Sequence, residues 1–252
     1  MCGIAGTLAR SPLARADADT LLRMNAALVH RGPDGGRIFT GGPAGLAHRR
    51  LSIIDLSDRG SQPMTNEDGT IVLVANGEIY NHRELRSFCE ARGHRFSSDS
   101  DCEAIIHMYE EVGAEVASRL RGMFAFALWD ARAGRMLLAR DRLGQKPLYW
   151  TLRADGLAFA SEIGALLADP RTTAELDPAA LDAYLALQYV PHPWTIFRDI
   201  RSLPPGSLIE VGCGQEPAPR RYWDVSFAPG PELDVDEAAA RVRAAVEEAV
   251  RI

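Results

Sequence analysis

The stretch of sequence that decides the fold class runs from Met123 to Ser161 and reads MFAFALWDARAGRMLLARDRLGQKPLYWTLRADGLAFAS. It contains four short apolar segments separated by turn residues, at 123–130, 136–141, 147–152 and 157–161. Apolar runs of this length, bounded by Gly, Asp and Pro, are typical of β-strands. We therefore expect an antiparallel meander in this part of the chain.

Strands and helices alternate on the N-terminal side of this stretch. Residues 45–51 and 71–75 are predicted to be strands joined through the polar turn at 66–69. Ser100 and Glu103 have the spacing of a capping box that opens a helix. Apolar residues at helical spacing predict helices at 19–30, 82–92, 100–113, 176–187 and 235–252. The mixture predicts an α+β fold class.

The bulk composition excludes several classes of function. The chain has 252 residues, 46% of them hydrophobic and 25% charged, as in ordinary globular domains. Its formal net charge is -6, and scattered Lys and Arg argue against a nucleic-acid or membrane partner. The start of the chain lacks a signal-peptide pattern. The four cysteines lie far apart without a C-x-x-C pair, so we expect no metal, no disulfides and a reducing, cytoplasmic setting.

The C-terminal part differs in character from the rest. Prolines punctuate residues 191–231, which places a domain boundary near 205–232. Residues 235–252 then carry an apolar stripe at three- and four-residue spacing. This final helix either docks back on the preceding domain or begins a domain that the sequence does not contain.

Cys2 combines a nucleophile with a potential base. If Met1 is removed, the α-amine lies on the same residue as the thiol. A free thiol is only about 3% ionised at neutral pH, and an amine with a pKa near 8 can take its proton. A lone cysteine at this position can equally be an inert buried thiol, so the other motifs in the sequence are needed to distinguish the two cases.

The segment Asn76-Gly77-Glu78 follows the predicted strand at 71–75 directly. Attack on a carboxamide places negative charge on oxygen, and an Asn side-chain N–H beside a backbone N–H can stabilise that charge. Glycine permits the close approach this requires. The alternative is an ordinary Asn-Gly turn between strands.

An amino-acid substrate needs a cation for its α-carboxylate and an anion for its α-ammonium. Arg50 can supply a planar, two-pronged donor from the end of a strand, although alternation alone leaves Arg49 as a competitor. Asp101 can bind the ammonium, or it can simply place negative charge at a helix N-terminus.

These fragments together resemble the class II glutaminase domain of glutamine-hydrolysing asparagine synthetases, an N-terminal-nucleophile hydrolase. The resemblance rests on several segments taken jointly: Cys2–Gly6, Arg31–Asp34, Arg50–Asp55, Asn76–Asn81, Ser100–Glu103, Gly122–Ala127, Arg140–Tyr149 and Ala160–Glu162. Gly164 is one departure, because the family pattern has Lys there. Amidotransferases of hexosamine or purine synthesis share the Cys-Gly-Ile start but match these segments less well.

The resemblance implies a fold and a set of roles. The expected fold is a four-layer αββα sandwich of two antiparallel sheets. Cys2 attacks the glutamine side-chain amide, and Asn76 with Gly77 forms the oxyanion hole. Arg50 binds the α-carboxylate, and Asp101 with Glu78 engages the α-ammonium. Leu51 and Ile53 complete the expected glutamine-binding residues.

The resemblance also implies what lies around this domain. Residues 1–206 are expected to be the glutaminase domain, and 207–252 a linker with the first helix of an ATP-dependent synthetase domain. The Ser-Gly-Gly-x-Asp-Ser loop of that domain is absent from the sequence, so ATP and Mg²⁺ belong to a partner in cis or in trans. A homodimer is also expected. The alternatives are a glutamine-sensing or scaffold domain without catalysis, and an amidotransferase with a different acceptor.

Overall fold

Two six-stranded antiparallel sheets form the centre of the computed structural model, which describes residues 1–252 apart from 53–56, 229 and 231. Sheet A has the strand order β10 (Ile200–Ser202), β8 (Tyr149–Arg153), β9 (Gly156–Ala160), β1 (Gly3–Ala9), β3 (Ala44–Arg50) and β2 (Gly35–Gly41). Sheet B has the order β12 (Arg220–Arg221), β11 (Ser207–Gly212), β7 (Arg135–Arg140), β6 (Gly122–Asp130), β5 (Ile71–Ile79) and β4 (Met64–Thr65).

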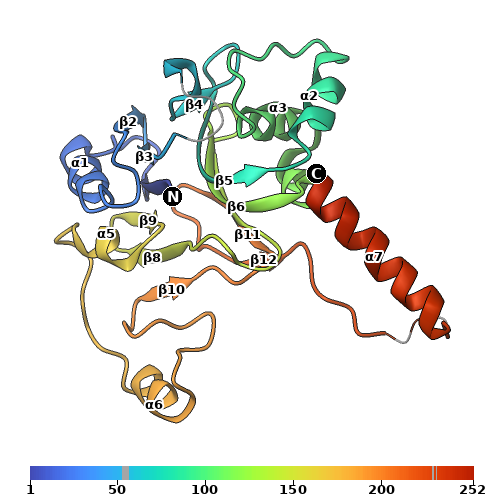
Figure 1. Ribbon diagram of the computed structural model, residues 1–252. Helices are drawn as coiled ribbons and strands as arrows, with labels where there is room; N and C mark the ends of the chain where they lie inside the picture. Colours follow the sequence, from blue (N-terminus) through green and yellow to red (C-terminus); the bar gives the residue numbers. More distant parts are fainter. Residues whose placement is uncertain (53–56, 229, 231) are drawn as a thin grey trace.

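Helices cover the outer face of each sheet. The helices α1 (Ala18–Ala26) and α5 (Ile163–Leu167) pack on sheet A, and α2 (His82–Glu90), α3 (Glu103–Val112) and α4 (Val116–Arg119) pack on sheet B. In Figure 1 the layers follow one another from α1 at the left to α2 and α3 at the upper right. Short 3-10 turns at Asp58–Gly60 and Gly113–Glu115 complete this part. The expected four-layer αββα sandwich is therefore confirmed.

Strand alternation explains the three apolar cores. In β5, Val72 and Val74 enter the core between the sheets, whereas Ile71 and Leu73 enter the core under α2 and α3. Successive side chains of a strand point to opposite faces, so a strand buried on both faces reads as a continuous apolar run. This is why the central strands lack a clear polar–apolar alternation.

The predicted helices are confirmed with small shifts of their ends, and the third one begins differently. The residue before Glu103 is Cys102, which makes no side-chain capping bond. The Glu103 carboxylate instead accepts hydrogen bonds from the N–H and hydroxyl groups of Ser97 and Ser98. The predicted capping box between Ser100 and Glu103 is therefore wrong, because a longer turn before the helix satisfies the carboxylate.

The predicted meander is wrong in its connections, although its four strands exist. β6 and β7 pair in sheet B, whereas β8 and β9 pair in sheet A. The chain therefore changes sheet between β7 and β8, which short-range sequence signals do not reveal. The strands predicted at 45–51 and 71–75 likewise fall in different sheets.

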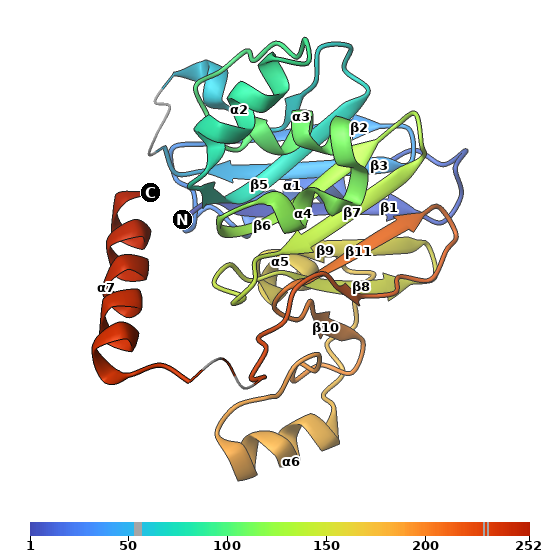
Figure 2. The same cartoon turned by 90° about the vertical axis from the view of Figure 1, so that its right-hand side faces the viewer.

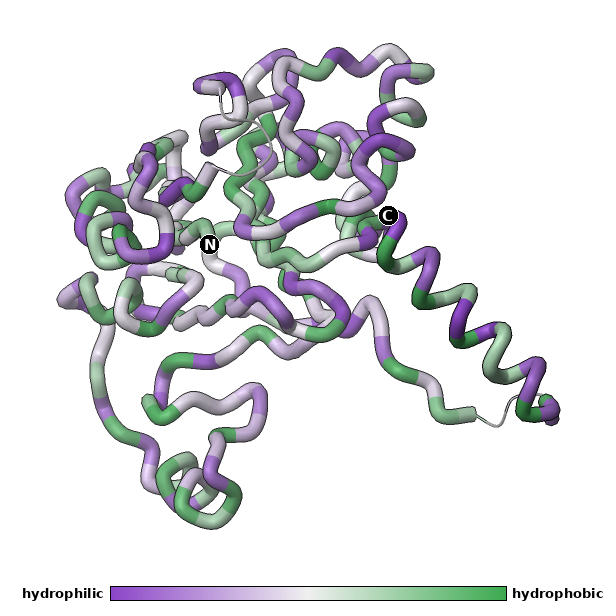
Figure 3. The backbone as a smooth tube through the Cα atoms, viewed as in Figure 1, coloured by the Kyte–Doolittle hydropathy of each residue, from purple (hydrophilic) through white to green (hydrophobic). Residues whose placement is uncertain are grey.

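The C-terminal part extends the sandwich before it leaves it. β11 pairs with β7 through residues 208–212, so sheet B continues past residue 206, where we expected the domain to end. The helices α6 (Pro178–Leu187) and α7 (Val235–Arg251) project from the four layers (Figure 2). Apolar and polar residues alternate along α7 (Figure 3), and Arg121 pairs with Glu248 on it at 2.8 Å. Within the described residues, no helix is long and apolar enough to span a bilayer.

Candidate active site

Two strands from different sheets direct Cys2 and Asn76 into the same space. Ile4 and Leu8 of β1 point into the core between the sheets, and Cys2 has the same parity along the chain. Val74 of β5 points into that core from sheet B, and Asn76 shares its parity. Because side chains alternate along a strand, both side chains face the gap between the sheets. The chain's N-terminus lies at this gap in Figure 1.

A pocket of about 190 Å³ opens where these residues meet. It contains every described residue that the sequence singled out for catalysis or glutamine binding. These are Cys2, Arg50, Leu51, Asn76, Gly77, Glu78 and Asp101. The remaining predicted residue, Ile53, lies outside the described residues. Four sequence segments, from both sheets and from the turn before α3, thus converge on one cavity.

The Cys2 thiol is held by the backbone of Leu51. The Leu51 N–H donates to Sγ at 3.4 Å, and Sγ donates to the Leu51 carbonyl at 3.6 Å. Burial raises the pKa of the Cys2 thiol and outweighs the lowering effect of the Leu51 amide. The thiol is therefore protonated at neutral pH and needs a base before it can attack.

The structure decides between Arg49 and Arg50. Leu46 points into the core between the sheets, so Arg50, four residues further along β3, faces the same way and lines the pocket. Its Nη1 donates to the Ser57 carbonyl at 2.8 Å. Arg49 points to the opposite face, where its Nε donates to the Asn25 carbonyl at 3.1 Å. Arg50 is thus the guanidinium at the pocket.

Asn76 and Gly77 present N–H donors at the pocket. The Asn76 side chain is 2% exposed, and its Nδ2 has no hydrogen-bond partner among the described residues. The backbone N–H of Ala75 donates to Gln62 Oε1, and that of Ile79 donates to Asp101 Oδ2. Both N–H groups therefore point to the edge of β5 that faces away from β6. Gly77 lies between them, and alternate residues of a strand direct their N–H groups to the same edge. Its N–H therefore points towards the pocket.

The position of Gly77 also requires glycine. A Cβ on this residue would lie 2.4 Å from the Met123 carbonyl oxygen of the neighbouring strand. The segment Asn76-Gly77 is not a turn, because β5 continues through Ile79 and pairs with β6 throughout. The prediction that this segment directly follows a strand is therefore wrong, because the segment lies inside β5. β4 pairs only with Val72 and Leu73, so it does not cover the edge of β5 at Asn76 and Gly77.

Glu78 and Asp101 place two carboxylates at the other side of the pocket. Asp101 is 5% exposed, and its Oδ2 accepts from Ile79 N at 2.6 Å. Burial raises the pKa of both side chains, and the charge of Asp101 raises that of Glu78 further. A buried carboxylate next to a half-buried one forms a suitable site for a cation such as an ammonium group.

The pocket also contains residues that no sequence motif indicated. His48 is buried, and burial lowers its pKa to about 3, so its ring is neutral. It has the same parity on β3 as Arg50, a signal that could have found it. Lys146 and Cys102 line the same cavity. Lys146 Nζ contacts the Met1 sulfur at 3.5 Å, so Met1 fills part of the cavity in the chain as it stands.

This architecture is that of the N-terminal-nucleophile hydrolases. Glutamine phosphoribosylpyrophosphate amidotransferase from B. subtilis superimposes with a TM-score of 0.65 at 19% identity, over 88% of this chain and 49% of that one. The glutamine amidotransferase domain family matches residues 1–223. The chain belongs to this family.

Curated relatives narrow the comparison. Glutamine-hydrolysing asparagine synthetase 1 of Bacillus subtilis is 39% identical over 254 residues, a match that covers the whole chain and 40% of that protein. Asparagine synthetase 2 of Oryza sativa is 43% identical over 170 residues, which cover 67% of this chain and 28% of that protein. The chain therefore spans well under half the length of these relatives.

Proposed function

We propose that this chain hydrolyses glutamine to glutamate and ammonia, with Cys2 as the nucleophile once Met1 has been removed. The observation that carries the proposal is the buried Nδ2 of Asn76, which has no hydrogen-bond partner in the described part of the chain. It lies beside the Gly77 N–H in the pocket that also contains Cys2. A buried donor without a partner is costly to folding, which is accounted for if it serves a charge that appears during a reaction.

The chemistry follows from the groups in the pocket. The Cys2 α-amine takes the thiol proton, and sulfur attacks the side-chain carbonyl carbon of glutamine. The oxyanion that forms accepts from Asn76 Nδ2 and Gly77 N–H. When the C–N bond breaks, the amine returns the proton to the leaving group, and ammonia departs. Water then attacks the γ-glutamyl thioester, which releases glutamate and restores the thiol.

The remaining pocket residues orient the amino-acid end of glutamine. Arg50 pairs with the α-carboxylate, while Asp101 and Glu78 bind the α-ammonium. Leu51 positions the thiol through its backbone. The role of Ile53 stays a prediction.

The wider role is the ammonia-supplying half of asparagine synthesis. The names of the relatives support this, as does the length by which they exceed the chain. In this proposal the segment after the sandwich is a linker and the first helix of a synthetase domain that uses ATP and Mg²⁺. The exposed apolar side chains of α6 and α7 support such a partner: Leu181, Tyr184, Leu185, Leu187, Val235, Val242, Val246 and Val250. A homodimer, a cytoplasmic setting and aspartate as acceptor belong to the same proposal.

The alternative is a domain that binds glutamine without turning it over. Retention of Met1 would favour this alternative. Met1 then fills part of the pocket, and its peptide bond makes the Cys2 nitrogen an amide. An amide nitrogen is no base, so the thiol would keep its proton.

Intact-mass spectrometry separates these possibilities. The purified chain is mixed with glutamine and quenched in acid within the first turnovers. The proposal expects a mass without Met1, and in the quenched sample an added γ-glutamyl group that peptide mapping assigns to Cys2. The Cys2→Ala variant should show no adduct. A chain that keeps Met1, or an adduct on another residue, would refute the proposed chemistry.

A further inference from the structure

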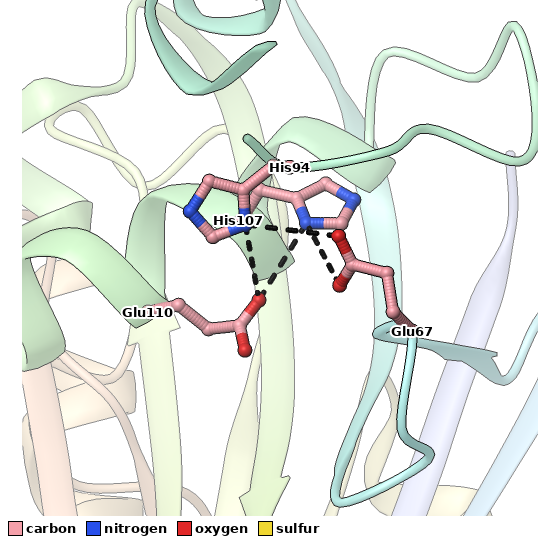
Figure 4. Close-up of side chains that lie close together, drawn as sticks. All are labelled: Glu67, His94, His107 and Glu110. Carbon is pink, nitrogen blue, oxygen red and sulfur yellow. Dashed lines mark ion pairs between the residues drawn. The ribbon is translucent and has the colours of Figure 1, made fainter. Parts of the chain in front are cut away.

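Four side chains outside the glutamine pocket direct their polar atoms at a common point (Figure 4). Glu67 comes from the turn between β4 and β5, His94 from the loop after α2, and His107 with Glu110 from one face of α3. One ligand atom of each lies within 4.8 Å of the others. Three segments distant in the sequence thus bring together two imidazoles and two carboxylates.

The separations between these atoms fit metal ligands better than hydrogen-bond partners. Glu110 Oε2 lies 3.5 Å from the Nδ1 atoms of both His94 and His107, and Glu67 lies 3.7 Å from His107 Nδ1 and 3.9 Å from His94 Nδ1. Hydrogen bonds between such groups measure about 2.7–3.2 Å. Ligands about 2.0–2.1 Å from a tetrahedral ion lie roughly 3.3–3.4 Å apart.

The outer atoms of the two imidazoles fix which nitrogen faces the common point. His94 Nε2 lies 3.0 Å from Glu111 Oε1, so it carries the proton and leaves Nδ1 free as a ligand. His107 Nε2 lies 3.7 Å from Glu103 Oε1. A carboxylate behind each imidazole is the arrangement that orients histidines at metal sites.

Each of the two carboxylates likewise uses one oxygen for hydrogen bonds and leaves the other available at the common point. Glu110 Oε1 accepts from Asn66 Nδ2 at 2.9 Å and from Arg132 Nη2 at 3.2 Å. Its other oxygen, Oε2, is buried and has no hydrogen-bond partner among the described residues. Glu67 Oε1 accepts from Arg95 N at 2.8 Å. Each carboxylate therefore keeps one oxygen available at the common point.

The burial of His107 is the independent sign of a ligand. Its side chain is 1% exposed, and neither ring nitrogen has a hydrogen-bond partner within the described part of the chain. A buried polar ring without hydrogen-bond partners destabilises the folded chain. An ion bound to Nδ1 would remove this destabilisation at the nitrogen facing the cluster.

We propose that Glu67, His94, His107 and Glu110 bind one divalent first-row transition ion, with Zn²⁺ the best match. Nitrogen and oxygen donors in a set of four suit zinc, and four protein ligands describe a closed, structural site. The ion would tie the turn before β5 and the loop after α2 to α3. Asp101 immediately precedes α3, so the same ion would steady one wall of the glutamine pocket. The sequence predicts no metal site, because it contains no close pairs of cysteine and histidine.

Metal titration of the 252-residue chain in the Cys2→Ala background tests the proposal, because that background removes the pocket thiol as a competing ligand. The chain is stripped with a chelator, titrated with Zn²⁺, and its bound metal is measured after gel filtration. We expect one Zn²⁺ per chain and a rise in melting temperature on addition of Zn²⁺. His94→Gln and Glu110→Gln should each weaken binding by at least about 100-fold and abolish the thermal shift.

His30→Gln is the matched control, because His30 is an exposed histidine that pairs with Glu162 away from the cluster. It should bind Zn²⁺ like the parent. Far-UV circular dichroism of the stripped variants establishes that they fold, and Co²⁺ substitution reports tetrahedral coordination through its visible absorption. Absence of stoichiometric Zn²⁺ binding by the parent, or equal binding by folded His94→Gln and Glu110→Gln, would overturn the proposal. Neither result depends on glutamine hydrolysis.

Discussion

The buried side chain of Asn76 destabilises the fold but suits the proposed reaction. Its Nδ2 is buried without a partner among the described residues, in a strand whose preceding inward-facing side chains are Val72 and Val74. Replacing it should therefore cost little stability, since no hydrogen bond is lost. Its value lies in the charge that the proposed reaction creates beside it.

We expect Asn76→Ala to lower kcat for glutamate formation by about 10²–10³-fold, the usual cost of losing one oxyanion donor, with a small change in KM. The melting temperature should stay close to that of the parent. Steady-state glutaminase assays and thermal unfolding measure both quantities. A large rise in KM with an unchanged kcat would assign Asn76 to substrate binding instead.

Asp101→Asn should act on binding. The loss of one charged partner for the α-ammonium should raise KM for glutamine by about 10- to 100-fold, while the amide oxygen can still accept from Ile79 N. Because burial raises the pKa of Asp101 in the folded state, its charge disfavours folding above that pKa. The variant should therefore be at least as stable as the parent at neutral pH. A markedly lower melting temperature would contradict this.

The raised pKa values of Glu78 and Asp101 also predict a pH dependence of binding. Protonation removes the negative charge that holds the ammonium, so KM for glutamine should rise as the pH falls. The rise should begin above the ordinary carboxyl range, because both pKa values are raised. The KM of Asp101→Asn should change less over the same pH interval. Equal pH profiles for the two proteins would count against this assignment.

At the residue scale, local motifs in the sequence indicated side chains that the fold brings together, and their catalytic and binding roles stay predictions. Cys2, Arg50, Asn76, Gly77 and Asp101 all reach the one pocket. The alternation of side chains along β3 distinguishes Arg50 from Arg49 as the pocket residue only once the face of the strand that lies between the sheets is known. His48 and the proposed metal ligands were missed, because their convergence depends on contacts between segments far apart in the chain.

At the scale of elements, β5 does more than the sequence indicated. We predicted a strand of five residues, and β5 spans nine, from Ile71 to Ile79. Pairing with β6 along this whole length overrides the turn-forming tendency of Asn76-Gly77. The extension holds Asn76 and Gly77 in a rigid strand, which suits groups that must be placed before the reaction.

A buried ion-pair network joins β8 to the segment after α5. Asp169 is 0% exposed and bonds to Arg171, with Nη2 to Oδ2 at 2.8 Å, and to Arg153 on β8. Burial alone would raise the pKa of Asp169, but the two arginines hold it below its usual range. Asp169→Asn should lower the free energy of unfolding by roughly 3 kcal/mol at neutral pH, because it removes the buried carboxylate that Arg153 and Arg171 share and leaves them the exposed Asp155.

The matched control is Glu175→Gln, which breaks an exposed pair with Arg198 and should cost at most about 1 kcal/mol. A lowered folded pKa stabilises above the unfolded pKa and loses its effect as the pH falls through the folded one. The difference between parent and Asp169→Asn should therefore shrink in acid below about pH 4. Urea unfolding at several pH values measures this. A difference that is constant with pH would show that packing, not charge, is lost.

At the scale of the whole molecule, the two sheets meet to form the pocket, and their assignment was the hardest feature to predict. Hairpins such as β6–β7 and β8–β9 follow from local turn signals. Which sheet each hairpin joins depends on long-range pairing, such as β11 with β7 and β1 with both β3 and β9. The four-layer arrangement came from the family resemblance, and strand patterns alone predicted only an α+β class.

The limits of the folded unit can be tested by truncation. A chain that ends at residue 223 keeps β11 and β12 and loses α7, which has no buried residues. It should retain cooperative unfolding with a melting temperature within a few degrees of the parent. A chain that ends at residue 206 loses Leu208, Ile209 and Val211 from the cores and should fail to fold. Cooperative unfolding of the shorter chain would contradict this account.

The central claim is that Cys2 is the nucleophile of a glutaminase, and the rate of glutamate release from glutamine tests it most directly. The assay compares the parent, Cys2→Ala and Cys213→Ala, the last removing a half-buried cysteine outside the pocket. We predict that Cys2→Ala unfolds like the parent and releases no glutamate above the uncatalysed rate, whereas Cys213→Ala retains the parent's rate. Glutamate release by folded Cys2→Ala at the parent's rate would contradict the account.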